Sequence, residues 1–227
     1  MVVFARAPVA GRTKTRLIPA LGPERAAELY RCFLLDIVNG LRHVPADVIV
    51  AAAEQEDAAP LSAALGGADR SVAQLMVQSG SDLGERILNA VRHTLSHGRP
   101  AAVVIGTDAP DLPADVIAKA FDLLGSHDLV LGPCSDGGYY LIGLRAAMPS
   151  LFRGMRWSSD SVLSETVKRA EALGLGVALL EPWDDVDTPD DLRSLRARLT
   201  RQVTAGGSIP CRRTWDYLCD LSEDESA

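Results

Sequence analysis

A basic segment near the start of the chain has the composition of a phosphate-binding loop. Residues 6–17 read R-A-P-V-A-G-R-T-K-T-R-L and combine one glycine with four cations, which are Arg6, Arg12, Lys14 and Arg16. Guanidinium and ammonium groups bind phosphate oxygens through charge-assisted hydrogen bonds, and Gly11 lets backbone N–H groups approach a ligand. The pattern is not a Walker P-loop, because arginine replaces both the first glycine and the lysine of that motif. The segment suits a polyphosphate, with a solvated basic turn as the alternative.

Two carboxylates further along the chain have the placement of metal ligands. Asp108 follows the apolar run 101–105, where a charged side chain contributes little to a hydrophobic core. Asp187 lies in the acidic segment 184–191, just before a predicted helix. Mg²⁺ and Mn²⁺ are typically held by carboxylates together with phosphate oxygens of a substrate. If the two loops are neighbours, Asp108 and Asp187 share one metal ion. The alternative is that Asp108 caps a turn and the later acids favour the helix dipole.

Other residues that could do chemistry form weaker patterns. The four cysteines match no zinc-binding spacing and include no C-x-x-C motif, which indicates a reduced protein. His93 and His97 are spaced to share one helix face, but the sequence offers no third ligand. A solvent-exposed histidine pair is therefore the simpler interpretation.

The hydrophobic pattern predicts alternating strands and helices that would bring these segments together. Strands are predicted at residues 2–5, 47–53, 72–77, 101–105, 128–131, 139–144 and 176–180. Helices are predicted at residues 23–42, 58–65, 83–95, from 112 onward, 160–173 and 188–199. This order predicts a three-layer α/β/α sandwich with a mostly parallel mixed sheet, and antiparallel pairing around Gly137 and Gly138. Ligands of such sheets bind beyond the carboxyl ends of the strands, which is where the basic loop and Asp108 fall.

The bulk composition restricts the class of protein. The chain has 227 residues, is 47% hydrophobic and carries a net charge of −7, which argues against a nucleic-acid-binding protein. No apolar run reaches the length of a membrane span, and no signal peptide is recognisable, so we expect a cytoplasmic protein. We expect one domain over residues 1–200 and a C-terminal segment, 201–227, that is either loosely ordered or docked on the body or on a second subunit, as in a homodimer.

Six motifs, taken in order along the chain, resemble a bacterial family of glycosyltransferase-A-like transferases. They are F-A-R-A-P-V-A-G-R-T-K-T-R-L, S-D-L-G-E-R, G-T-D-A-P-D-L, G-P-C-S-D-G-G-Y-Y-L-I-G-L, W-S-S-D and D-V-D-T-P-D-D-L. The match covers roughly residues 2–199. The chain is also more distantly similar to the phospholactate and molybdenum-cofactor guanylyltransferases. The resemblance implies the nucleotide-diphospho-sugar transferase fold and a nucleotide or nucleotide-sugar substrate.

The resemblance also implies roles for individual residues by their position in these motifs. The phosphate loop would use Arg6, Gly11, Lys14 and Arg16. Mg²⁺ or Mn²⁺ would bind Asp108 and Asp187. The nucleobase and ribose would contact Asp82, Leu83, Gly84 and Arg86. The sugar or acceptor side would be formed by Asp136, Gly137, Gly138, Tyr139, Trp157 and Ser158.

The motifs leave three functions open. The usual assignment of the family favours a glycosyltransferase, in which Lys14, Arg16 and the metal at Asp108 stabilise a departing diphosphate and Asp136 activates an acceptor hydroxyl. The first alternative is a nucleotidylyltransferase, in which a phosphorylated acceptor attacks a nucleoside triphosphate and pyrophosphate leaves. The second is a nucleotide-binding protein without catalysis. The sequence lacks both the G-x-G-T-R loop of nucleotidylyltransferases and a D-x-D motif, because Asp108 and Asp111 are three residues apart.

Overall fold

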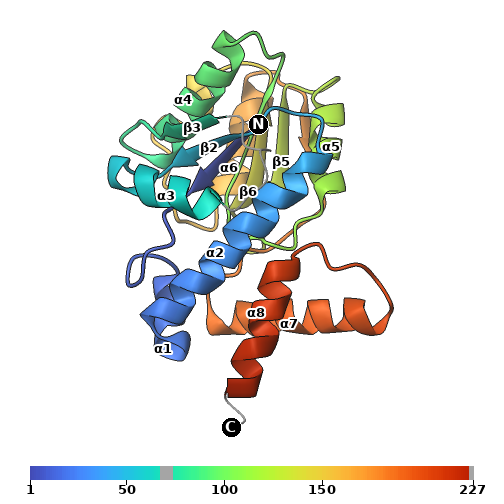
Figure 1. The fold of residues 1–227 in the computed structure, drawn as a ribbon. Helices are drawn as coiled ribbons and strands as arrows, with labels where there is room; N and C mark the ends of the chain where they lie inside the picture. The colour runs from blue at the N-terminus through green and yellow to red at the C-terminus, as the bar shows by residue number, and fades with distance from the viewer. Residues whose placement is uncertain (67–73, 225–227) are drawn as a thin grey trace.

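A seven-stranded mixed β-sheet forms the centre of the molecule, in the strand order β3–β2–β1–β4–β6–β5–β7. The computed structural model describes residues 1–66 and 74–224. The strands are β1 (Val2–Ala5), β2 (Ile49–Ala52), β3 (Gln74–Val77), β4 (Ala102–Ile105), β5 (Leu129–Pro133), β6 (Tyr139–Leu144) and β7 (Val177–Leu179). Helices cover both faces of this sheet, so the predicted three-layer architecture is confirmed (Figure 1).

The helices alternate with the strands along the chain, as the hydrophobic pattern predicts. They are α1 (Ile18–Leu21), α2 (Pro23–Gly40), α3 (Ala58–Leu65), α4 (Leu83–Ser96), α5 (Ala114–Leu123), α6 (Val162–Ala172), α7 (Pro189–Thr204) and α8 (Arg212–Asp224). The shorter 3₁₀ turns are η1 (Thr15–Leu17), η2 (Leu41–His43), η3 (Gln55–Asp57) and η4 (Pro149–Leu151). Two predicted residues of β3, Val72 and Ala73, lie outside the described residues.

One strand of the sheet runs against its neighbours and affects where the site lies. β1 is parallel to β2 and β4, whereas β6 is antiparallel to both β4 and β5. The antiparallel pairing predicted around Gly137 and Gly138 is therefore confirmed, because these residues belong to the connection between β5 and β6. Since Ile105 pairs with Leu141, the first residue of β6, Tyr139, lies at the edge of the sheet where β1 and β4 end.

Two apolar cores hold the helices on the sheet. On one face, α2 and α5 pack side chains such as Leu34, Val38 and Ile117 against the central strands. On the other face, α4 contributes Ile87 and Val91. Every residue of β4 is buried, which explains why this strand is a continuous apolar run and not an alternating pattern.

A third apolar cluster lies away from the sheet and includes part of the C-terminal segment. The first half of α2 contributes Leu29 and Phe33, and α8 contributes Leu218 and Leu221. Of the two alternatives expected for the C-terminal segment, loose order or docking on the body, Arg212–Asp224 show the second, because they form a helix packed beside α2 (Figure 1). α7 also continues to Thr204, past its predicted end at residue 199.

A buried carboxylate fixes the start of α8 on α2. Asp36 of α2 is 4% exposed and accepts the backbone N–H of Arg213 at 3.2 Å and that of Thr214 at 2.7 Å. The first N–H groups of a helix have no partner inside the helix, so a carboxylate from a neighbouring helix satisfies them. Among the helices in the described part of the chain, none is both long and apolar enough to cross a lipid bilayer.

Candidate active site

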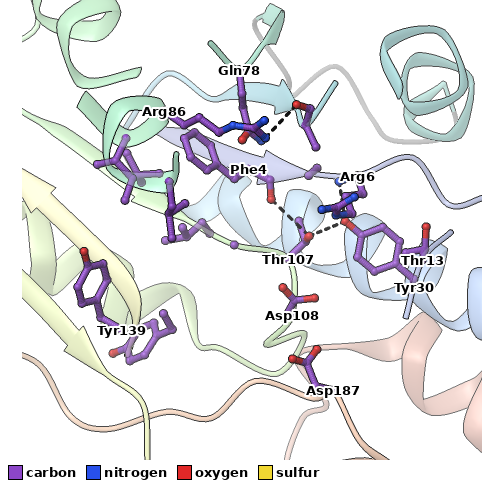
Figure 2. A pocket seen from close by; sticks show the side chains of 18 of the residues that line it. Phe4, Arg6, Thr13, Tyr30, Gln78, Arg86, Thr107, Asp108, Tyr139 and Asp187 are labelled. Atoms are coloured by element: carbon purple, nitrogen blue, oxygen red, sulfur yellow. Dashed lines mark hydrogen bonds between the residues drawn. The ribbon is translucent and has the colours of Figure 1, made fainter. Parts of the chain in front are cut away.

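A cleft of about 810 Å³ opens at the edge of the sheet where β1 and β4 end. Its walls come from the loop after β1, the start of α4, the loop after β4 and the first residues of β6. Figure 2 shows Asp108 and Asp187 close together at one side of this cleft, Gln78 and Arg86 across from them, and Tyr139 at a third side. The topology thus places the predicted site at the carboxyl ends of the parallel strands, where ligands of α/β sheets bind.

Lys14 lies between the two predicted metal ligands. Its Nζ is 2.5 Å from Asp108 Oδ1, 2.9 Å from Asp187 Oδ1 and 2.7 Å from the carbonyl oxygen of Val186. The Lys14 side chain is 3% exposed, whereas the carboxylates remain 40% and 44% exposed toward the cleft. The same ammonium also lies 5.6 Å from the centre of the Phe33 ring. The two carboxylates and one backbone carbonyl therefore surround one buried cation.

The electrostatics of this cluster keep Lys14 charged. Burial alone would lower the pKa of Lys14, but the charges and hydrogen bonds of Asp108 and Asp187 outweigh it, so the pKa is raised. The backbone of Lys14 is in the left-handed conformation, with φ 48°. Few residues other than glycine adopt this conformation, so the surrounding contacts must hold it in place.

The segment that carries Asp187 is fixed next to Asp108 by the backbone and by the cap of α7. The N–H of Val186 donates to the carbonyl of Asp108 at 2.8 Å. Thr188 caps α7, and Asp191 completes the capping box with its own side chain. Asp187 takes no part in this cap with its side chain and instead contacts Lys14 and, at 3.6 Å, Arg16. Asp191 therefore serves the helix, and Asp187 faces the cleft.

The arginines of the basic loop point toward solvent along the same cleft. Arg16 is 73% exposed, Arg12 lies 3.7 Å from Asp57, and Arg6 is exposed. The pair of Arg16 with Asp187 is weak because water screens both charges, and the partner of Arg12, Asp57, is buried and 3.7 Å away. The exposed guanidinium groups can therefore be recruited by an anion. Thr13 holds the loop in shape, since its buried hydroxyl donates to the carbonyl of Ala7 at 2.7 Å. The four predicted cations all line the cleft.

A hydrogen-bond network that sequence reasoning missed connects the ends of β1 and β4. The Tyr30 hydroxyl accepts the backbone N–H of Arg6 at 2.9 Å and lies 2.6 Å from the hydroxyl of Thr107 (Figure 2). Thr107 in turn donates to the carbonyl of Phe4 at 3.4 Å. Burial, with the charge of Asp108, raises the pKa of Tyr30 to about 12, so the hydroxyl stays protonated. A tyrosine on the apolar face of α2 gives no signal in sequence beyond that of a core residue.

The residues predicted to hold the base and ribose lie at the far end of the cleft, with one exception. Asp82 caps α4 by accepting the N–H of Glu85 at 2.8 Å, and Leu83 is a largely exposed apolar residue beside it. Arg86 donates to the carbonyl of Ala53 at 3.2 Å and to the carboxylate of the next residue, Glu54. The exception is Gly84, which is not part of the cleft lining.

Gly84 lets α4 approach a neighbouring loop. A Cβ atom at this position would lie 2.6 Å from the Cβ of Phe152 and 2.7 Å from the Trp157 ring.

Gln78 was not predicted from the sequence but lines the cleft, where its amide nitrogen donates to the carbonyl of Ala51 at 2.9 Å. This contact fixes the orientation of the Gln78 amide at this end of the cleft.

The residues predicted for the acceptor side are dispersed. Tyr139 lines the main cleft, whereas Asp136 lines an adjoining cavity of about 300 Å³ that also includes Asp187. The Asp136 carboxylate accepts the N–H of Gly138 at 2.8 Å and so stabilises its own turn. Gly137 has φ 86° and lies so close to Asp160 that a side chain would not fit.

The last two predicted acceptor residues are outside the main cleft. The Trp157 ring stacks on Phe152 with 6.3 Å between ring centroids, and Ser158 forms a tight turn with φ 63°. Neither is among the described residues that line the cleft. The structure therefore places Trp157 in packing and gives no contact of Ser158 with the cleft.

The residues present fit a divalent cation only with ligands from a substrate. Within residues 1–66 and 74–224, no group of three or more His, Cys, Asp or Glu side chains is arranged to hold a metal ion. Asp108 and Asp187 supply two carboxylates beside a backbone carbonyl, which is the all-oxygen donor set that Mg²⁺ accepts. The remaining ligands would be water and phosphate oxygens.

Comparison with known proteins identifies the family of this chain. The sequence profile of a family described as "Uncharacterized protein conserved in bacteria (DUF2064)" matches residues 37–159. The chain belongs to the DUF2064 family. This match includes the loop of Asp108 and the turn of Asp136, whereas the basic loop and Asp187 lie outside it.

A solved structure is similar over almost the whole chain. It is a candidate nucleotide-diphospho-sugar transferase from Desulfovibrio desulfuricans G20, which is 32% identical and superposes with a TM-score of 0.87 over 98% of this chain and 94% of its own. A more distant structure, 4-diphosphocytidyl-2C-methyl-D-erythritol synthase from Anaerococcus prevotii DSM 20548, is 12% identical with a TM-score of 0.57 over 88% of this chain and 98% of its own. The second likeness shows the fold alone.

A curated relative is similar over part of the chain. The 3-phospho-D-glycerate guanylyltransferase of Phenylobacterium zucineum (strain HLK1) is 35% identical over 124 residues, which are 52% of this chain and 50% of that protein. The chain thus spans about half the length of this relative. Together the comparisons confirm the nucleotide-diphospho-sugar transferase fold of this DUF2064 member, and the relatives that they name are transferases.

Proposed function

We propose that the protein is a nucleotidylyltransferase, which transfers a nucleoside monophosphate from a nucleoside triphosphate to a phosphorylated acceptor and releases pyrophosphate. One observation carries this proposal. The exposed arginines of the basic loop line the same cleft as the cluster of Lys14, Asp108 and Asp187. A triphosphate needs more cationic partners than the diphosphate of a nucleotide sugar, and the basic loop supplies four. The guanylyltransferase relative supports the same reaction class.

The sequence-based preference for glycosyl transfer has less support. That preference rested on the usual assignment of the family and not on a residue. It also required a base to activate an acceptor hydroxyl, and Asp136 was the candidate. In the structure the Asp136 carboxylate is engaged with the N–H of Gly138 and lines a cavity beside the main cleft. A phosphorylated acceptor needs no such base, because its second pKa is near 6 and the attacking oxygen is already ionised at neutral pH.

The proposed reaction forms one bond and breaks one bond at the α-phosphate. An oxygen of the acceptor phosphate bonds to the α-phosphorus while the bond from this phosphorus to the bridging oxygen of the β-phosphate breaks. Pyrophosphate leaves with the electron pair, and Arg12, Lys14 and Arg16 are placed to stabilise its charge. A divalent cation held by Asp108 and Asp187 would supply charge neutralisation of the phosphate oxygens.

The nucleotide would lie along the cleft with its base near Gln78, Leu83 and Arg86. The phosphates would then reach the basic loop at the other end, and the acceptor would approach from the side of Tyr139. An attack opposite to the leaving pyrophosphate requires this arrangement, because the acceptor and the leaving group must lie on opposite sides of the α-phosphorus. From the curated relative, GTP is the first donor and 3-phospho-D-glycerate the first acceptor to test.

The experiment compares two products with the same purified protein. Each nucleoside triphosphate is incubated with Mg²⁺ or Mn²⁺ and a panel of phosphorylated acceptors, and pyrophosphate release is measured. In parallel, nucleotide sugars are tested for release of nucleoside diphosphate. We expect pyrophosphate from at least one triphosphate only when the acceptor is present. Release of nucleoside diphosphate from a nucleotide sugar, without pyrophosphate from any triphosphate, would refute the proposal and support glycosyl transfer.

A further inference from the structure

The ammonium group of Lys14 lies at the point where the two candidate metal ligands converge. It contacts one oxygen of Asp108, one oxygen of Asp187 and the carbonyl of Val186, all within 2.9 Å. These are the same oxygen types that would coordinate Mg²⁺ or Mn²⁺. The cluster therefore already contains a cation before any metal is added.

The surroundings hold Lys14 firmly in this position. Its side chain is almost fully buried, the carbonyl of Val186 anchors it from the protein side, and the Phe33 ring lies beside it. Its backbone adopts the left-handed conformation, with φ 48°. A flexible surface lysine would move aside readily, whereas Lys14 must exchange several contacts before its ammonium can leave the carboxylates.

The charges around the carboxylate pair disfavour a free divalent cation. Asp108 and Asp187 bring two negative charges, Lys14 brings one positive charge, and the exposed guanidinium of Arg16 lies 3.6 Å from Asp187. These cations neutralise the carboxylate pair and weaken its attraction for a free divalent ion. The phosphates of a nucleotide reverse this balance, since they add several negative charges and give Lys14 and Arg16 new partners.

We propose that Lys14 occupies the cation position of the Asp108–Asp187 pair in the nucleotide-free protein and prevents a free divalent cation from binding there. One consequence of this inference rests on the proposed function. The metal enters the cleft as a complex with the nucleotide, and the Lys14 ammonium then moves from the carboxylates to the phosphates. The substrate is thus the metal–nucleotide complex and not the two components bound in either order.

The test measures Mn²⁺ binding to the full chain by calorimetric titration without nucleotide. We expect very weak binding to the unmodified protein and an affinity higher by about tenfold or more in Lys14→Met, because the competing positive charge is gone. Lys14→Gln, which can still donate a hydrogen bond to a carboxylate, should give a smaller gain. Adding Asp187→Asn to Lys14→Met should abolish the gain, which would show that the new Mn²⁺ is bound by the carboxylate pair.

A second cation of the same loop provides the matched control. Arg12 contacts Asp57 and not the carboxylate pair, so Arg12→Gln should leave Mn²⁺ binding to the free protein unchanged. Thermal unfolding of each variant establishes that it is folded, and Lys14→Gln replaces Lys14→Met if the latter is not. Tight binding of Mn²⁺ to the unmodified protein, or equal affinity in both Lys14 variants and the unmodified protein, would overturn the inference.

The same samples separate this inference from the proposed function. Each variant is also titrated with a non-hydrolysable nucleoside triphosphate in the presence of Mn²⁺. A gain of Mn²⁺ affinity in Lys14→Met together with no triphosphate binding to the unmodified protein would refute the nucleotidylyltransferase proposal while supporting the role of Lys14. If the unmodified protein binds the triphosphate but neither Lys14 variant gains affinity for Mn²⁺, the inference about Lys14 is refuted and the proposed function is supported.

Discussion

Replacing Tyr30 by phenylalanine tests whether one buried hydroxyl holds the two loops of the cleft together. The hydroxyl accepts the N–H of Arg6 and bonds to Thr107, so it connects the loop after β1 with the loop that carries Asp108. Tyr30→Phe keeps the ring and the apolar packing of α2 and removes only these two contacts. The expected loss can therefore be worked out from the groups that are left without a partner.

The magnitude follows from the two contacts. The Arg6 N–H loses its acceptor in a part-buried position, which costs about 1–3 kcal/mol. Thr107 loses one of its two hydrogen bonds and keeps the longer one to Phe4, for a further loss of about 0.5–1.5 kcal/mol. We expect a total decrease in the free energy of unfolding of about 1.5–4.5 kcal/mol. For a chain of this length, the melting temperature would fall by roughly 3–18 °C.

Urea unfolding followed by circular dichroism measures this loss, with Tyr140→Phe as the matched control. The Tyr140 hydroxyl makes a single bond, at 2.9 Å, to the carbonyl of Glu181, an exposed residue where water can replace it. This control should lose at most about 1.5 kcal/mol. A double-mutant cycle of Tyr30→Phe with Thr107→Val should show coupling, because both changes remove the same hydrogen bond. Additive losses, or a loss no larger than in the control, would refute the network.

Three further outcomes test other parts of the structure. Gly84→Ala should lose about 1–3 kcal/mol of unfolding free energy in urea because its Cβ overlaps Phe152, whereas Gly40→Ala, with open space around it, should be neutral or stabilising. Asp36→Ala should lose about 0.5–2 kcal/mol and weaken protection of α8 amides in hydrogen exchange; unchanged protection would contradict the capping role. Burial, with nearby acidic charges, raises the pKa of Asp185 to about 7, so the stability that the protonated group contributes is complete below its ordinary pKa of 3.8 and is lost progressively as pH rises to about 7. Without divalent metal, Asp185→Asn should therefore gain stability relative to the unmodified protein as pH rises from 4 to 8, as thermal unfolding can measure.

The sequence predicted the location of the cleft better than its internal contacts. Residues such as Asp108 and Arg6 could be predicted because they are charged side chains just after apolar strands, where they contribute little to a hydrophobic core. The convergence of Lys14 on both carboxylates could not be predicted, since it depends on the left-handed turn at Lys14 and on a contact between segments far apart in the chain.

Other features were hidden because their sequence signal had an ordinary explanation. Tyr30 has the spacing of a core residue on α2, and its partner Thr107 lies far away in the chain. Trp157 was assigned to the acceptor side by its motif, but the ring packs where Gly84 leaves room. α8 follows a glycine-rich segment and ends in acidic residues, so its apolar face could be interpreted only as docking somewhere on the body or on another subunit.

The packing of α8 on the first half of α2 has a consequence for how the chain matures during synthesis. Leu29 and Phe33 emerge from the ribosome long before the residues that cover them, such as Leu218. The nascent chain therefore exposes this apolar surface until α8 has been translated, and an exposed apolar surface promotes aggregation. Asp187 also emerges long after Lys14 and Asp108, so the cluster of Lys14 with both carboxylates is incomplete until the segment before α7 has been translated.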